Sequence, residues 1–135
     1  MRAAVEIAGG IAIVDLEEED VVEFDPDGSI EPQDVPVGLP LVIAADRSGP
    51  LIVAVVARRP PLVVSRDAGS TWHEAGGGLP AGRAVAVSPE HPDLILFASA
   101  SRLHLSRDGG RFWHALGLEL DDIRALEWLE ETDLG

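Results

Sequence analysis

The sequence of 135 residues contains no cysteine, tyrosine, lysine or asparagine, and aromatic residues make up only 4% of it. Without cysteine the chain has no disulfide framework, no thiolate metal site and no cysteine nucleophile. Its ten basic residues are all arginine and face 24 acidic residues, which gives a formal net charge of -14. Such a surface repels phosphate backbones and anionic lipid, so we expect no nucleic-acid partner and no membrane insertion.

The remaining composition is that of one folded domain. Hydrophobic residues make up 46% of the chain and charged residues 25%, a balance typical of a soluble globular protein. The first apolar stretch, Met1 to Ile7, is interrupted by Glu6 and followed by two glycines and an acidic run, which does not fit a signal peptide. No apolar stretch is long enough to span a bilayer. We therefore expect a single cytoplasmic domain.

Two segments of the chain are copies of one unit. Residues 62–73 (LVVSRDAGSTWH) align without gaps with residues 103–114 (LHLSRDGGRFWH), at an offset of 41 residues. Repeats of roughly 40 to 45 residues built from short strands are typical of β-propeller blades. Short apolar runs at Leu51–Ala57 and Leu94–Ala98, bounded by proline-containing turns, favour strands over helical repeats of similar length.

The repeated unit resembles the Asp-box, or BNR repeat, whose usual form is Ser-x-Asp-x-Gly-x-Thr-Trp. The first copy matches every defining position, and the second has Phe112 where threonine is usual. The resemblance implies a hairpin between the two outer strands of a blade, as in sialidase-like, sortilin-like and photosystem assembly factor-like propellers. An Asp two residues before a Gly can accept hydrogen bonds from its own turn, which agrees with this placement. We interpret the following residues as structural: Ser65, Asp67, Gly69, Thr71, Trp72, Ser106, Asp108, Gly110 and Trp113.

The repeat predicts an all-β chain of about three blades, each a four-stranded antiparallel sheet. The expected division is a first blade over about residues 1–40, a second over about 41–81, a third over about 82–121 and a closing strand at 122–129. Three outer strands begin the chain without an inner strand before them, and one inner strand ends it. We therefore expect the C-terminal strand to close the N-terminal blade, because closure removes exposed sheet edges.

The number of blades is too small for a closed ring, since propellers typically have four to eight. We therefore expect a homodimer, in which two chains join head to tail into a six-bladed ring. In this hypothesis each chain donates the strand around Ile123–Trp128 to the first blade of its partner.

Catalytic function is not expected. Sialidases are the enzyme class that the Asp-box first suggests, but they use a tyrosine nucleophile, and this chain has none. Other glycosidases with the motif use paired carboxylates, and the sequence does not single out a pair among 24 acids. The expected function is a non-catalytic binding or assembly module with a protein or carbohydrate ligand. The alternative is a glycoside hydrolase-like or other carbohydrate-active propeller that uses carboxylates at the ring centre.

Metal and cofactor sites are not expected either. The four histidines, His73, His91, His104 and His114, are dispersed and lack the spacing of metal ligands. The acidic run at residues 17–20 lacks the spaced ligands and glycine of a calcium loop, and we interpret it as a solvated turn.

One insertion interrupts the repeat. The segment Arg58-Arg59-Pro60-Pro61 is two residues longer than its counterpart, Ser101-Arg102. Insertions in repeat proteins map to loops, which makes this segment a candidate contact loop. An ordinary polar hairpin is the alternative interpretation.

Overall fold

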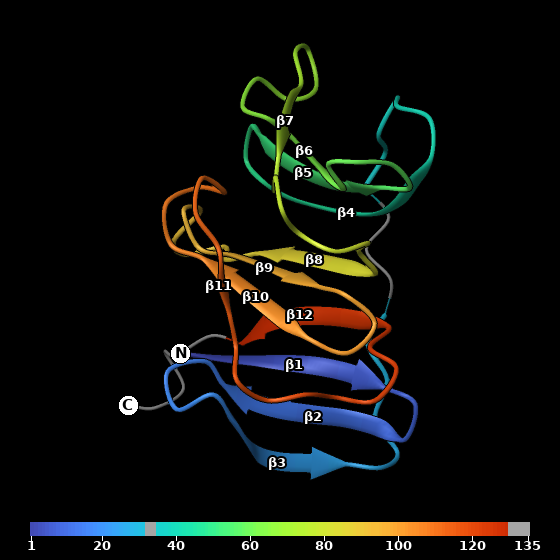
Figure 1. Ribbon diagram of the computed structural model, residues 1–135, viewed down its shortest axis with the longest axis vertical. Coiled ribbons are helices and arrows are strands. Elements are labelled where there is room, and N and C mark those ends of the chain that lie inside the picture. The colour runs from blue at the N-terminus through green and yellow to red at the C-terminus, as the bar shows by residue number, and fades with distance from the viewer. Residues whose placement is uncertain (32–34, 130–135) are drawn as a thin grey trace.

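The computed structural model describes residues 1–31 and 35–129. These residues form strands and no helix, and the strands build three four-stranded antiparallel sheets (Figure 1). The predicted all-β class is confirmed, and the three sheets are consistent with propeller-like blades.

The strand order of each sheet follows the chain, apart from one strand. Sheet A has the order β12 (Ala125–Leu129), β1 (Arg2–Ile7), β2 (Gly10–Asp15) and β3 (Asp20–Asp25). Sheet B consists of β4 (Val42–Ser48), β5 (Leu51–Val56), β6 (Leu62–Ser65) and β7 (His73–Ala75). Sheet C consists of β8 (Ala84–Val87), β9 (Ile95–Ala98), β10 (Leu103–Ser106) and β11 (His114–Ala115).

The C-terminal strand completes the N-terminal sheet, as predicted. β12 pairs antiparallel with β1, so that Ala3 lies opposite Trp128 and Val5 lies opposite Leu126. The ring hypothesis assigned this strand to the first sheet of a partner, whereas in the structure it pairs with β1 of its own chain.

Sheet C lies between the other two sheets. Its first strand, β8, contacts both β4 of sheet B and β12 of sheet A, and Figure 1 shows the three sheets following one another along the long axis. Apolar side chains fill both interfaces, and burying one fully contributes roughly 1.5–3 kcal/mol. The cluster between sheets A and C includes Val5, Val14, Leu96, Leu103 and Leu126. The cluster between sheets B and C includes Val53, Val55, Leu62, Ile95 and Phe97.

A third apolar cluster covers the other face of sheet B. Ala54, Val56 and Val63 are at most 2% exposed, although they alternate with the residues that face sheet C. Val37 and Leu39 pack against them, and both belong to the connection at residues 26–41. The connection therefore covers a sheet face at the end of the molecule that no neighbouring sheet covers.

Most of the net charge lies in sheet A and its connections. Residues 1–31 and 121–129 contain thirteen acidic residues and two arginines, a net charge of -11. Residues 35–81, with sheet B, contain four arginines and three acidic residues, and residues 82–120, with sheet C, contain four of each. The surfaces of sheets B and C are therefore not strongly acidic, although the chain as a whole is.

Candidate functional site

The first repeat hairpin joins β6 to β7 and is closed by hydrogen bonds of two side chains. The Ser65 hydroxyl donates to Asp67 Oδ1 at 2.8 Å and accepts from the Gly69 N–H at 2.8 Å. The Asp67 carboxylate also accepts from the Thr71 N–H at 2.8 Å and from the Thr71 hydroxyl at 2.5 Å. The Thr71 hydroxyl, the Thr71 N–H and the Ser65 hydroxyl lower the pKa of Asp67 to about 2. The carboxylate is therefore ionised and engaged within its own turn.

The second repeat hairpin, between β10 and β11, has the same frame with one change. Ser106 donates to Asp108 Oδ1 at 2.9 Å and accepts from the Gly110 N–H at 2.8 Å. Asp108 accepts from the N–H groups of Arg111 and Phe112 at 3.1 and 3.0 Å, and the Phe112 N–H is the largest cause of its lowered pKa. Phe112 has no hydroxyl to donate and is 78% exposed, which explains why the motif tolerates it.

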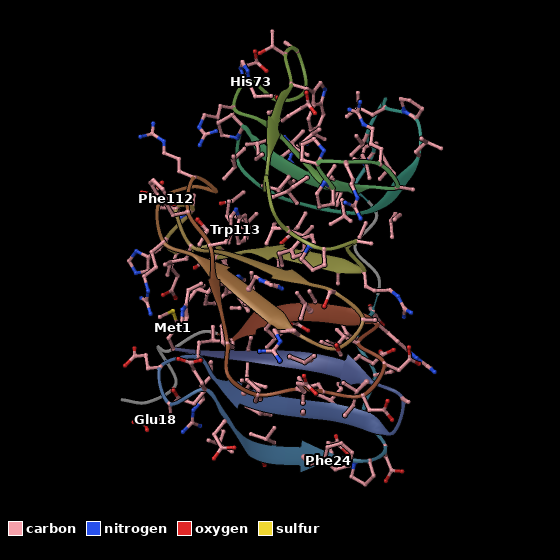
Figure 2. All side chains as sticks on the ribbon, viewed as in Figure 1. Met1, Glu18, Phe24, His73, Phe112 and Trp113 are labelled. Atoms are coloured by element: carbon pink, nitrogen blue, oxygen red, sulfur yellow. The ribbon has the colours of Figure 1, made fainter. Side chains whose placement is uncertain are left out.

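The two tryptophans of the repeats cover the apolar clusters beside their hairpins. Trp113 packs against the cluster between sheets B and C, with its ring centroid 6.1 Å from that of Phe97, and its Nε1 donates to the Gly110 carbonyl at 3.1 Å. Trp72 packs against the third cluster, on the other face of sheet B. Figure 2 shows Trp113 next to the exposed Phe112 at the tip of sheet C.

The acidic run forms the turn between β2 and β3, where a third copy of the hairpin would lie. Asp15 Oδ1 accepts from the N–H groups of Glu17 and Glu18, both at 2.9 Å. Glu19 crosses to sheet C, where its carboxylate lies 3.1 Å from His114 Nε2 and accepts from the Gly117 N–H at 2.6 Å. Sequence reasoning missed this contact, because it joins residues 95 and 98 positions apart.

The histidines are not brought together. His73, His91 and His114 are exposed, and His73 and His114 lie on β7 and β11 of neighbouring sheets. His104 is only 9% exposed, and its Nε2 has no hydrogen-bond partner. Within the described residues, no group of three or more histidine, aspartate or glutamate side chains is placed to hold a metal ion.

The inner strands carry two notable carboxyl groups. Asp46 on β4 is half-buried and accepts from the Val87 N–H of β8 at 2.8 Å, which ties sheet B to sheet C. Burial raises the pKa of Asp46, against the opposing effect of its hydrogen bonds. Asp122, just before β12, accepts from Arg83 and Arg124, both at 2.9 Å, and these arginines lower its pKa.

The predicted contact loop lies between β5 and β6 beside an apolar hollow. Arg58 and Arg59 are exposed, whereas Pro61 is buried. The hollow has a volume of about 330 Å³ and extends from this loop to Leu79 and to Ile43, whose side chain is 49% exposed. Two cationic side chains therefore border an apolar surface.

No protein-family model matches the chain, and no curated protein matches it. The described residues include no helix that is long and apolar enough to cross a membrane.

Proposed function

We propose that this chain is a non-catalytic binding or assembly module built from Asp-box propeller blades. The proposal rests on one observation: the most distinctive acidic groups of the chain already have hydrogen-bond partners within the chain. Asp67 and Asp108 are held within their own turns, and Asp46 and Asp122 have hydrogen-bond partners on the inner strands. We therefore assign binding to the exposed loops and hollows, which are the surfaces where scaffolds of this kind usually bind their partners.

The contact loop is the binding surface that we favour for a protein partner. Arg58 and Arg59 supply positive charge, and the hollow of about 330 Å³ supplies apolar area next to them. The partner segment that fits this surface places an acidic side chain next to an apolar one. The small positive balance of residues 35–81 allows such a segment to approach sheet B despite the net charge of the whole chain.

The test is selection of binders from a library of random peptides displayed on phage, followed by affinity measurement on the purified chain. We expect the enriched peptides to combine acidic and apolar residues, and the double variant R58E/R59E to bind them roughly tenfold or more weakly. R107E is the matched control, because Arg107 is exposed on the hairpin of sheet C and does not line the hollow. Equal loss in both variants, or no enrichment, contradicts the proposal.

A carbohydrate-active propeller is the alternative, and the raised pKa of Asp46 favours it. A general acid needs a carboxyl that stays protonated near the working pH, and Asp46 lies on an inner strand. The test is hydrolysis of a panel of chromogenic glycosides. Turnover by the purified chain that D46N abolishes supports the enzyme, whereas equal background rates for both chains support the binding module.

Completion of the three sheets to a six-bladed ring by a second copy stays a prediction. Light scattering after size exclusion tests it directly, since the ring requires a particle of twice the mass of one chain. A monomer at micromolar concentration contradicts the homodimer.

A further inference from the structure

Two gaps between neighbouring sheets are related by the internal repeat. His114 and Gly117 border the gap between sheets C and A, where both contact Glu19. The residues 41 positions earlier are His73 and Gly76, and both border the gap between sheets B and C. The same pair of residue types therefore lies at equivalent positions of the sequence repeat, although Gly76 is buried with a φ of 74° and Gly117 is exposed.

In the gap between sheets C and A, this pair binds a carboxylate. Glu19 Oε2 lies 3.1 Å from His114 Nε2, and Glu19 Oε1 accepts the Gly117 N–H at 2.6 Å. The His114 and Gly117 contacts lower the pKa of Glu19, so the ionised carboxylate is the form that the pair favours. An imidazole and a backbone N–H thus form a two-point receptor, and the β2–β3 turn supplies its occupant.

In the gap between sheets B and C, no side chain of the described residues takes the place of Glu19. The turn of sheet C that faces this gap is the repeat hairpin with Gly109, Gly110 and Arg111, whose acidic residue, Asp108, accepts hydrogen bonds from its own turn and does not line the groove. A groove of about 470 Å³ remains between the sheets, bordered by His73 and Gly76. The Gly76 N–H forms no hydrogen bond with any described residue.

The charges of this groove suit an anion. Arg66 and Arg111 both line it, and Arg66 Nη2 reaches across the gap to the Gly109 carbonyl at 3.1 Å. Glu74 is the only acidic residue on the lining, and its charge is outnumbered by those of the two arginines. A guanidinium group forms strong charge-assisted hydrogen bonds with carboxylates, with a planar geometry that matches them.

We propose that the groove between sheets B and C binds a carboxylate side chain from an acidic segment of a partner protein, in the position that Glu19 occupies in the neighbouring gap. His73 and Gly76 supply the two hydrogen bonds, and Arg66 and Arg111 add positive charge. The occupant is a peptide segment because the bound carboxylate seen in this molecule is itself presented by an acidic turn, at residues 15–20. The site goes beyond the contact loop at residues 58–61 and is separate from it, so either surface can fail alone.

The test uses the full chain labelled with ¹⁵N and a peptide with the sequence of its own acidic turn, DLEEED. We expect addition of the peptide to shift the amide signal of Gly76 and the imidazole signals of His73. The variants H73Q and R111Q are expected to weaken binding roughly tenfold. Both side chains are exposed, so neither change removes a core contact.

Two controls make the outcome decisive. R107Q removes the arginine that is equivalent to Arg66 on the next sheet and does not line the groove, so its affinity should match that of the unmodified chain. A peptide in which the corresponding amide replaces every side-chain carboxylate, NLQQQN, should lose the Gly76 shift when both peptides have acetylated and amidated ends. Equal binding of both peptides, or an equal loss in R107Q, overturns the proposal. Signal shifts confined to the loop at residues 58–61 overturn it too, while leaving the proposed binding function intact.

Discussion

Replacing His104 with valine is expected to change the pH dependence of stability in a defined direction. The ring of His104 packs edge-on against Phe97 at a centroid distance of 5.8 Å, and its buried Nε2 has no partner. Burial lowers the pKa of His104, and the nearby Arg102 lowers it further. Valine occupies the equivalent repeat position, Val63, where it is only 2% exposed.

The magnitude follows from two opposing contributions. An unsatisfied buried nitrogen costs about 1–3 kcal/mol, which valine recovers. The aromatic pair with Phe97 contributes about 0.5–1.5 kcal/mol, which valine loses. Near pH 8, where His104 is neutral in both states, we expect the free energy of unfolding of H104V to lie between about 0.5 kcal/mol below and about 2.5 kcal/mol above that of the unmodified chain.

The pH dependence gives the sharper result. A histidine whose pKa is lower in the folded state binds a proton first in the unfolded chain, so stability falls as the pH drops below the ordinary value of 6.5. The slope is at most about 1.4 kcal/mol per pH unit, until the folded-state pKa is reached. H104V lacks this loss, so its advantage over the unmodified chain should grow toward about pH 5.

The assay is urea denaturation followed by tryptophan fluorescence, at several pH values between about 8 and 5. H91Q is the control, because His91 is exposed. The other titrating groups are the same in both proteins, so the difference in free energy of unfolding between H104V and the unmodified chain reports on His104 alone. A difference that stays constant over this pH range refutes the reasoning that His104 is held neutral by burial.

Two further substitutions test how the sheets pack. G82A should destabilise the chain by about 1–3 kcal/mol in the same denaturation assay, because the Cβ of the new alanine would lie 2.5 Å from an edge carbon of Phe97. G77A is the control and should change stability by less than about 0.5 kcal/mol, because the space around Gly77 is open. W128F should lower the free energy of unfolding by about 0.5–1.5 kcal/mol, because it removes the 2.9 Å hydrogen bond from Trp128 Nε1 to the Ala86 carbonyl. Unchanged stability would show that this hydrogen bond between sheets A and C is dispensable.

The sheets could be predicted from the sequence because the two copies of the repeat mark equivalent strands that lie far apart in the chain. An offset of 41 residues places Leu62 and Leu103 at the starts of equivalent strands, and both are fully buried on β6 and β10. The same register predicted that the last strand completes the first sheet. The ring hypothesis assigned that strand to the partner chain, whereas in the structure it pairs with β1 of its own chain.

The candidate site was less predictable, for a physical reason. The repeat marks residues that form their own turns, and most of the hydrogen-bonding capacity of such residues is used within the turn, as Asp67 illustrates. Contacts between sheets depend on side chains far apart in the chain, such as Glu19 and His114. The burial of His104 was not predicted either, although its alignment with Val63 places it at an equivalent strand position.

The first hairpin, which lacks the Asp-box, belongs to sheet A, whose strands come from both ends of the chain. The turn at residues 15–20 keeps an aspartate that accepts two N–H groups, but it lacks the tryptophan and presents Glu19 to His114 and Gly117. Glu19 adopts a φ of 56°, a left-handed conformation that non-glycine residues rarely occupy, which is reasonable if the contact between sheets stabilises the turn. The first hairpin therefore combines closure by Asp15 within the turn with a contact of Glu19 to the neighbouring sheet.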